Sequence, residues 1–293
     1  MIKITVFSTL AGALLGLMQS LAPAQAQATR TFVSSKGNDA NACSRAAPCR
    51  SFAGALAKTN SGGEINVLDA AGYGALTIDK AISIVNDGVG EAGVQAATGA
   101  TAITINAGTS DLIQLRGLTI DGAGVAANGI QFIAGNTLTI VNCVVRNFAG
   151  NGIYITPYLS MAFFISRTLV SDNSGNGISF VPTADLPSGM GVISEVKAVN
   201  NGSAIVIDGS NETIQALAVD IVNSIIANNA SFGIKPLTST GHLAPIVRLG
   251  KSVVTGNGTG ITNAPFVYSY LDNKIDGNTP DLAGGNLSTL TMR

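Results

Sequence analysis

Asp121 and Arg146 are the two residues whose types and spacing could support acid–base chemistry in this sequence. Each stands two residues before the corner of a repeated unit, in consecutive units, and Ser171 takes the same place in the next unit. An isolated acid and base could transfer a proton in a lyase. The alternative is a surface ion pair, which is favoured because no second carboxylate accompanies Asp121 to hold a metal. We therefore predict no metal or other cofactor.

Tyrosine and histidine supply the remaining candidates. Tyr154 and Tyr158, together with Phe163 and Phe164, could form a face on which sugar rings stack, or could simply pack a loop against the body of the protein. Packing is favoured because such side chains more often fill cores than bind sugars. The only histidine, His242, stands in a TGHL stretch that is typical of a surface loop.

A repeat of about 28 residues must position these side chains. LVSDN, KAVNN, IIANN and VVTGN end at Asn173, Asn201, Asn229 and Asn257. Apolar residues recur three and eight positions before each asparagine and four or five positions after it. Phe148 takes the asparagine position in a looser, earlier copy. Each unit therefore contains short β-type runs separated by polar turns.

This pattern predicts an all-β fold, a right-handed parallel β-helix of roughly eight rungs. The amphipathic helices of an α/β domain are missing between Gly108 and Asn278, and the leucine-rich frame is absent. Equivalent residues in a β-helix stack about 4.8 Å apart, so the asparagines should share one corner, adopt its turn conformation and hydrogen-bond to one another. A second column six residues before the ladder should stack in the same way, and its opposite charges should pair on the solvent face; it consists of Arg167, Glu195, Asn223 and Lys251.

Residues 1–28 have the features of a cleaved secretory signal peptide. Lys3 precedes a largely apolar run, and small-x-small patterns end at Ala26 and Ala28. An uncleaved membrane anchor is the alternative, but Gly12 and Gly16 dilute the apolar run and Pro23 breaks the helix just before these sites. No second hydrophobic span follows. We expect a secreted or periplasmic protein with one domain, 29–293, in which 29–80 form an N-terminal cap and the first rung.

Export would allow Cys43 and Cys49 to form a disulfide, whereas Cys143 lies in an apolar run and should be a buried free thiol. A short capping helix is predicted from Ser51 to Thr59, ended by Gly62 and Gly63. The chain carries 16 Lys+Arg against 17 Asp+Glu and no basic run, which argues against a nucleic-acid partner.

The stretch from Thr31 to Ile84 resembles the opening of secreted bacterial right-handed β-helix proteins of the pectin-lyase-like superfamily. The matching segments are FVSSKGND, PCRSFAGALA, GGEINVLDAAGYG and LTIDKAISI. The resemblance implies the fold, and it suggests a polysaccharide as partner. It does not define an activity, because the superfamily includes lyases, hydrolases, epimerases and members of no known activity. The polygalacturonase signatures N-T-D, D-D, G-H-G and R-I-K are absent.

Three functional hypotheses follow from these features. We favour carbohydrate interaction at the cell surface or in the periplasm without catalysis. A polysaccharide lyase acting on acidic polysaccharide is the first alternative, with Asp121 and Arg146 as its acid–base pair. Only for such a lyase does the resemblance imply Ca²⁺ as cofactor. A structural or adhesin-like surface solenoid is the second, because a long rigid repeat suits display.

Overall fold

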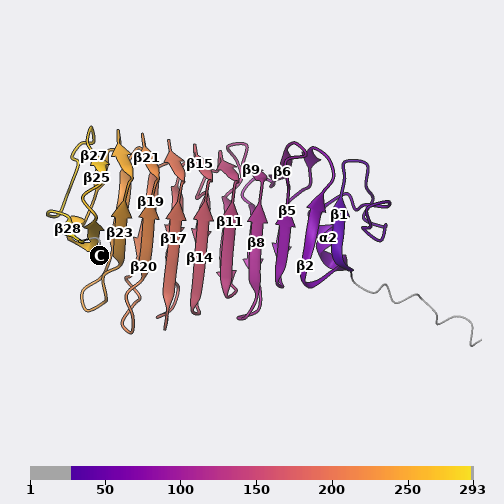
Figure 1. Cartoon of the computed structure of the whole chain (residues 1–293), viewed down its shortest axis with the longest axis horizontal. Coiled ribbons are helices and arrows are strands. Elements are labelled where there is room, and N and C mark those ends of the chain that lie inside the picture. Colours follow the sequence, from indigo (N-terminus) through magenta and orange to yellow (C-terminus); the bar gives the residue numbers. More distant parts are fainter. Residues whose placement is uncertain (1–27, 292–293) are drawn as a thin grey trace, which may run out of the picture.

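The computed structural model describes residues 28–291, which form an all-β solenoid with one α-helix near the N-terminus. Its strands lie side by side along the long axis, with the N-terminal cap at one end and the C-terminal residues at the other (Figure 1). All strands pair in parallel in three sheets, here named A, B and C, of 11, 9 and 8 strands. The chain thus completes about nine turns, and the predicted parallel β-helix is confirmed.

The strands follow one another in the order A, B, C along most of the chain. Sheet A contains β1 (Ala28–Val33), β2 (Thr59–Val67), β5 (Ile82–Val85), β8 (Leu112–Arg116), β11 (Thr137–Val141), β14 (Met161–Ser166), β17 (Gly189–Ser194), β20 (Ala218–Val222), β23 (Ile246–Gly250), β26 (Val267–Ser269) and β28 (Ser288–Thr289). Sheet B contains β3 (Ala71–Gly72), β6 (Ala92–Gln95), β9 (Leu118–Asp121), β12 (Val144–Arg146), β15 (Leu169–Ser171), β18 (Lys197–Val199), β21 (Ile225–Ala227), β24 (Val253–Thr255) and β27 (Lys274–Ile275). Sheet C contains β4 (Leu76–Ile78), β7 (Thr101–Asn106), β10 (Asn128–Ala134), β13 (Ile153–Ile155), β16 (Asn176–Phe180), β19 (Ser203–Asp208), β22 (Phe232–Leu237) and β25 (Thr259–Ile261).

The predicted apolar positions form the core. In sheet B, one column of in-register neighbours consists of Val170, Ala198, Ile226 and Val254, all with no exposed surface. Equivalent columns in sheets A and C are also buried, so each turn of the solenoid stacks its β-branched side chains on those of the next turn. Burial on the inner face of all three sheets makes this stack the main source of stability.

An asparagine ladder runs along the corner between sheets B and C. It consists of Asn173, Asn201, Asn229, Asn257 and Asn278. Each Nδ2 donates to the Oδ1 of the next asparagine at 2.8 to 3.1 Å, as predicted. The prediction that the ladder asparagines themselves adopt the turn conformation is wrong. The left-handed φ is found at the residue that precedes each of them. That residue makes the turn, which leaves the asparagine side chain free to enter the interior.

Helix α2 (Phe52–Lys58) begins at the predicted place but ends for a different reason. The Ser51 hydroxyl caps it by accepting the Gly54 N–H at 3.0 Å. The prediction that Gly62 and Gly63 end the helix is wrong, because both lie within β2. The chain enters β2 at Thr59, whose hydroxyl donates to the Ala55 carbonyl and lies 2.7 Å from the Thr31 hydroxyl of β1. These contacts anchor a β-branched residue in sheet A, which favours the strand over a longer helix.

The loop closed by the Cys43–Cys49 disulfide covers the free edge of β1. The Phe32 N–H donates to the Cys43 carbonyl at 2.8 Å, and the Cys49 N–H donates to the Phe32 carbonyl at 2.9 Å. The predicted disulfide is therefore present, and its loop protects backbone groups that would otherwise invite edge-to-edge association. Helix α2 packs behind it against β1, β2 and β4.

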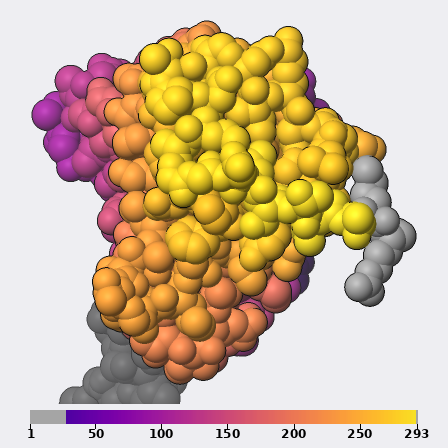
Figure 2. All heavy atoms as spheres, turned by 90° about the vertical axis from the view of Figure 1, so that its left-hand side faces the viewer, coloured from indigo at the N-terminus to yellow at the C-terminus, as the bar shows by residue number. Residues whose placement is uncertain are grey.

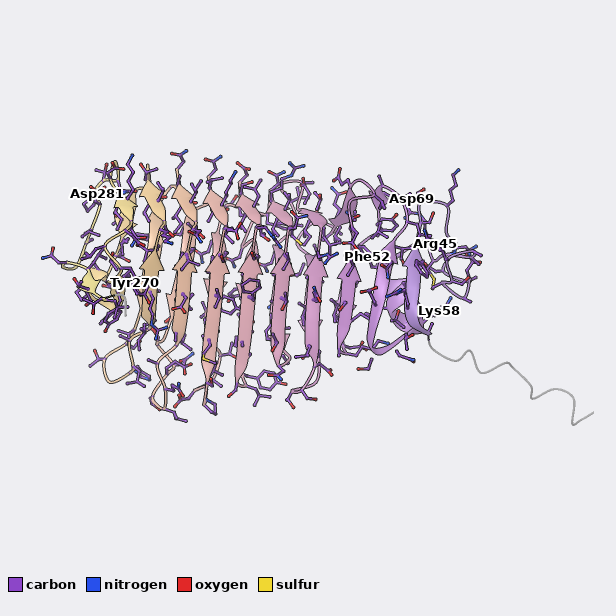
Figure 3. All side chains as sticks on the ribbon, viewed as in Figure 1. Arg45, Phe52, Lys58, Asp69, Tyr270 and Asp281 are labelled. Atoms are coloured by element: carbon purple, nitrogen blue, oxygen red, sulfur yellow. A yellow bond between two sulfur atoms is a disulfide. The ribbon has the colours of Figure 1, made fainter. Side chains whose placement is uncertain are left out.

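Residues that carry the family resemblance join one another inside this cap. The Asp69 carboxylate accepts hydrogen bonds from the Ser34 hydroxyl, the Ser35 N–H and the Tyr73 hydroxyl, each at 2.7 Å. Burial alone would raise the pKa of Asp69, but these donors lower it to about 2. The Tyr73 ring packs against Phe52 with centroids 5.0 Å apart, at the end where Figure 3 labels Asp69 and Phe52. The shared motifs therefore build a structural cap.

The C-terminal end is closed by its own residues. The 3-10 helix η1 (Ala264–Phe266) and the residues after it spread over the last turn, as Figure 2 shows in yellow. Asp281 ends the asparagine ladder by accepting both the backbone N–H and the Nδ2 of Asn278.

Residues 1–27, which make up nearly all of the predicted signal peptide, lie outside the described residues. Within residues 28–291 we find no helix that could span a membrane.

Candidate functional site

Asp121 and Arg146 meet on the outer side of sheet B. They are in-register neighbours on β9 and β12, and the Arg146 Nε lies 2.8 Å from Asp121 Oδ2. Asn147 Nδ2 lies 3.2 Å from both carboxylate oxygens, and the Ala123 N–H donates to Oδ1 at 2.8 Å. The predicted proximity of the pair is therefore present.

The surroundings of Asp121 favour its charged form. Partial burial would raise the pKa of this carboxyl, but the Ala123 N–H, the Arg146 guanidinium and the Asn147 amide together hold it below its ordinary value. A carboxylate stabilised in this way is a weak proton acceptor. The geometry is that of an internally satisfied ion pair.

The same site does not fit Ca²⁺. Both oxygens of Asp121 already accept hydrogen bonds from protein donors, and the Arg146 cation occupies the space where a metal would be attracted. Among residues 28–291, no three His, Cys, Asp or Glu side chains are grouped so that they could hold a metal ion. The donor set around Asp121 is therefore not one that suits Ca²⁺, which takes several oxygen ligands.

A hollow of about 460 Å³ lies beside Asp121 over the first strands of sheet B. Its floor contains Gly72 and Gly93, which are in-register neighbours without side chains. Glu91, Gln95 and Asp121 line it. We call it the glycine hollow. This hollow was not predicted from the sequence, although two glycines one turn apart at outward strand positions were a usable signal.

Two further hollows follow the turns between sheets A and B, which we call the A–B turns. One of about 500 Å³ includes Arg116 and Asp87, and the other, of about 510 Å³, includes Leu169, Lys197 and Ile225. Both hollows are lined by Asn142 and Arg167, so they are adjacent. We call the two together the corner groove.

The predicted ion pairs between stacked charges are not formed. Arg167, Glu195 and Lys251 do occupy equivalent A–B turns, but none of them has an ion pair within 4.0 Å among the described residues. All three side chains are exposed. At an exposed turn, the small Coulomb gain does not offset the entropy lost by fixing two long side chains.

Comparison with known proteins bears on the fold. No family model matches this chain, and no curated protein matches it either. The crystal structure of pectate lyase Pel9A is similar to it, with a TM-score of 0.60 and 14% sequence identity, over 89% of this chain and 77% of that one. The likeness is one of fold. At this identity it supports the β-helix architecture and leaves activity and ligand as proposals.

The aromatic candidates lie elsewhere on the solenoid. Tyr154 is half-buried on β13 of sheet C, and Tyr158 follows it with 47% of its surface exposed. Phe163 is a core residue whose ring meets Phe180 edge-on, with centroids 5.2 Å apart, whereas Phe164 is exposed on sheet A. The four aromatic residues therefore do not share one face, and the structure does not bring Tyr154 to the Asp121 pair on sheet B.

His242 lies close enough to Asp185 for their charges to interact, whereas Cys143 is buried. His242 lies in the loop after β22, with Nδ1 3.3 Å from the Thr240 carbonyl oxygen. Cys143 is the buried free thiol that the sequence predicts, and burial raises its pKa to about 11. Such a thiol is a poor nucleophile near neutral pH.

Glu212 is a buried carboxyl that the sequence analysis did not single out. It has no exposed surface in the loop after β19, where Oε2 accepts the Leu186 N–H at 3.1 Å and Oε1 has no hydrogen-bond partner. Burial, together with the nearby Asp185 charge, raises its pKa. Because it is enclosed, we assign Glu212 a role in stability and not in binding.

Proposed function

We propose that this protein binds carbohydrate on the side of the solenoid formed by sheet B and the A–B turns, without catalysis. The observation that carries this proposal is the arrangement of the glycine hollow and the corner groove on that one side. An elongated concave surface suits a linear polymer. Its lining combines exposed apolar groups with polar side chains, as ligand sites generally do.

A binding role without chemistry agrees with the state of the Asp121–Arg146 pair. Asp121 is held as an anion by three donors, and the Arg146 Nε is already bonded to it. The Cys43–Cys49 disulfide agrees with a protein that works outside the cytoplasm. We therefore propose a secreted or periplasmic protein that interacts with carbohydrate.

Glycan-array binding, combined with a screen for new unsaturated-uronate absorbance on acidic polysaccharides, tests the proposal. We expect selective binding and no new absorbance. A blocking variant locates the site. A side chain at Gly72 would meet no atom within 4 Å at its Cβ, so Gly72→Val should fold normally and fill the hollow.

The matched control is Thr104→Val, which places the same side chain on the outer side of sheet C. We expect Gly72→Val to weaken glycan binding and Thr104→Val to leave it unchanged. A wild-type protein that binds no glycan would refute the proposal, as would a protein that produces unsaturated uronate.

A further inference from the structure

We propose that the corner groove holds a strand of an anionic glycan aligned with the solenoid axis. This inference rests on the proposed carbohydrate interaction, and it adds the position, direction and charge of the ligand. The groove crosses successive A–B turns, and Asn142 and Arg167 line both of its adjacent hollows. It is thus longer than the glycine hollow and extends along the axis.

Four polar side chains that line the groove have no partner within the described residues, unlike Asn86, Thr168 and the Arg116–Asp87 pair. Within residues 28–291, the side chains of Asn142, Arg167, Glu195 and Asn223 form no hydrogen bond or ion pair. The asparagine ladder is the opposite case, because its buried amides are bonded in every turn from Asn173 to Asn278. The groove therefore presents a row of free donors and acceptors.

Residues in this row adopt a backbone conformation that glycine and asparagine favour over long charged residues. Arg167 and Glu195 have φ of 48° and 56°, in the left-handed region that suits glycine or asparagine. Gly117, Asn142 and Asn223 take that conformation in neighbouring turns. Long charged side chains at strained positions indicate a role for the side chains themselves.

The floor of the groove is largely apolar. Val144, Leu169, Lys197 and Ile225 are in-register neighbours on four successive strands of sheet B, and Ile225 has 40% of its surface exposed. Successive turns stack about 4.8 Å apart, so the floor offers regularly spaced contacts along the axis. A glycan could thus place the C–H face of successive sugars on this floor while its substituents reach the row of polar side chains.

The charges of the groove select an anionic ligand. Arg167 and Lys197 supply two cations against one anion, Glu195, whereas Arg116 and Asp87 neutralise each other. A free guanidinium fork binds carboxylate or sulfate through two parallel hydrogen bonds. Glu195 can accept hydrogen bonds from sugar hydroxyls.

A double variant tests the proposal by removing both cations of the groove with replacements that suit the local backbone conformation. Arg167→Gly suits the left-handed turn, and Lys197→Thr suits a strand. Affinity electrophoresis with polygalacturonate, dextran sulfate and dextran separates carboxylate, sulfate and neutral ligands. We expect the wild-type protein to prefer an anionic ligand, and the variant to bind it at least about tenfold more weakly, with less dependence on salt.

The control variant, Arg30→Ala with Lys235→Ala, removes two cations that do not line the groove and should leave binding unchanged. Thermal melts check that both variants fold. If the wild-type protein binds glycans but the double variant binds them equally well, or if dextran is preferred, the anionic corner groove is refuted while the proposed function stands. If no glycan of any class binds, both proposals fail together.

Discussion

The Nδ2 amide of Asn229 lies 2.8 Å from the Oδ1 of Asn257, one turn further along the solenoid. The same Nδ2 also lies 3.1 Å from the carbonyl oxygens of Ala198 and Ala227. One side chain thus satisfies two buried carbonyls at a corner where backbone pairing between strands is interrupted. The ladder is a structural requirement of the corner.

Replacing Asn229 by alanine should lower the free energy of unfolding by about 3 kcal/mol or more, because buried donors and acceptors lose their partners. The control is Asn228→Gly at the neighbouring exposed position, whose left-handed φ of 56° suits glycine. Urea denaturation measures both. Equal stability of the two variants would contradict the role of the ladder.

Ile226 and Ile225 provide a test of strand orientation. Ile226 has no exposed surface and Ile225 is 40% exposed, although they are adjacent on β21. Ile226→Asp should unfold the solenoid, because it buries a charge in the core. Ile225→Asp should change stability by about 1 kcal/mol or less. Circular dichroism melts measure the stability of both variants. If Ile225→Asp were more destabilising than Ile226→Asp, the core assignment would be wrong.

Substitution of Arg146 distinguishes a catalytic role of the Asp121–Arg146 pair from a structural one. Arg146→Ala should change stability by about 1 kcal/mol or less and leave glycan binding nearly unchanged, as expected for an exposed ion pair. The matched control is Arg248→Ala, which breaks the similar pair with Asp220 on sheet A. A wild-type protein with lyase turnover and a well-folded, inactive Arg146→Ala variant would overturn this view.

The disulfide loop should stabilise the cap by restricting the unfolded chain. Cys43→Ser combined with Cys49→Ser should lower stability by about 2 kcal/mol and increase aggregation, since the edge of β1 becomes less protected.

Mass spectrometry of the exported protein should show this disulfide and an N-terminus at Gln27 or Thr29. An intact Met1 would contradict the secretory signal.

Glu212 should make stability depend on pH. Folding raises its pKa, so the stability provided by its neutral form is present at low pH and is lost as the pH rises through the raised value. Glu212→Gln should therefore stabilise the protein at pH 8 more than at pH 4. Glu195→Gln, at an exposed turn, is the control. Parallel pH profiles for wild type and Glu212→Gln would disprove the effect.

The regular part of this fold could be predicted from sequence because its causes are periodic. Ile226 and the Asn229 ladder position recur with their equivalents at one interval, so burial and stacking followed from spacing. A second ladder was missed, in which the Val196 N–H donates to Ser224 Oγ and the Ser224 N–H to Ser252 Oγ, each at 3.2 Å. Its hydroxyl column is interrupted by valine, which hides the pattern.

The candidate site was harder to predict than the scaffold. The pairing of Asp121 with Arg146 followed from the register, but the donors Ala123 and Asn147 that restrain the carboxylate depend on local turn geometry. Ion pairing of Arg167 with Glu195 was wrongly expected because stacking sets only the spacing of the turns, whereas exposed side chains follow entropy and solvent.

The aligned amides of the asparagine ladder also produce a net dipole along the solenoid axis. Every amide from Asn173 to Asn278 donates toward the C-terminal end, so their dipoles add head to tail as peptide dipoles do in an α-helix. The positive end of this column meets the Asp281 carboxylate, and the donated hydrogen bonds lower the pKa of that group. Asp281 thus acts toward the whole column as an N-cap aspartate acts toward a helix.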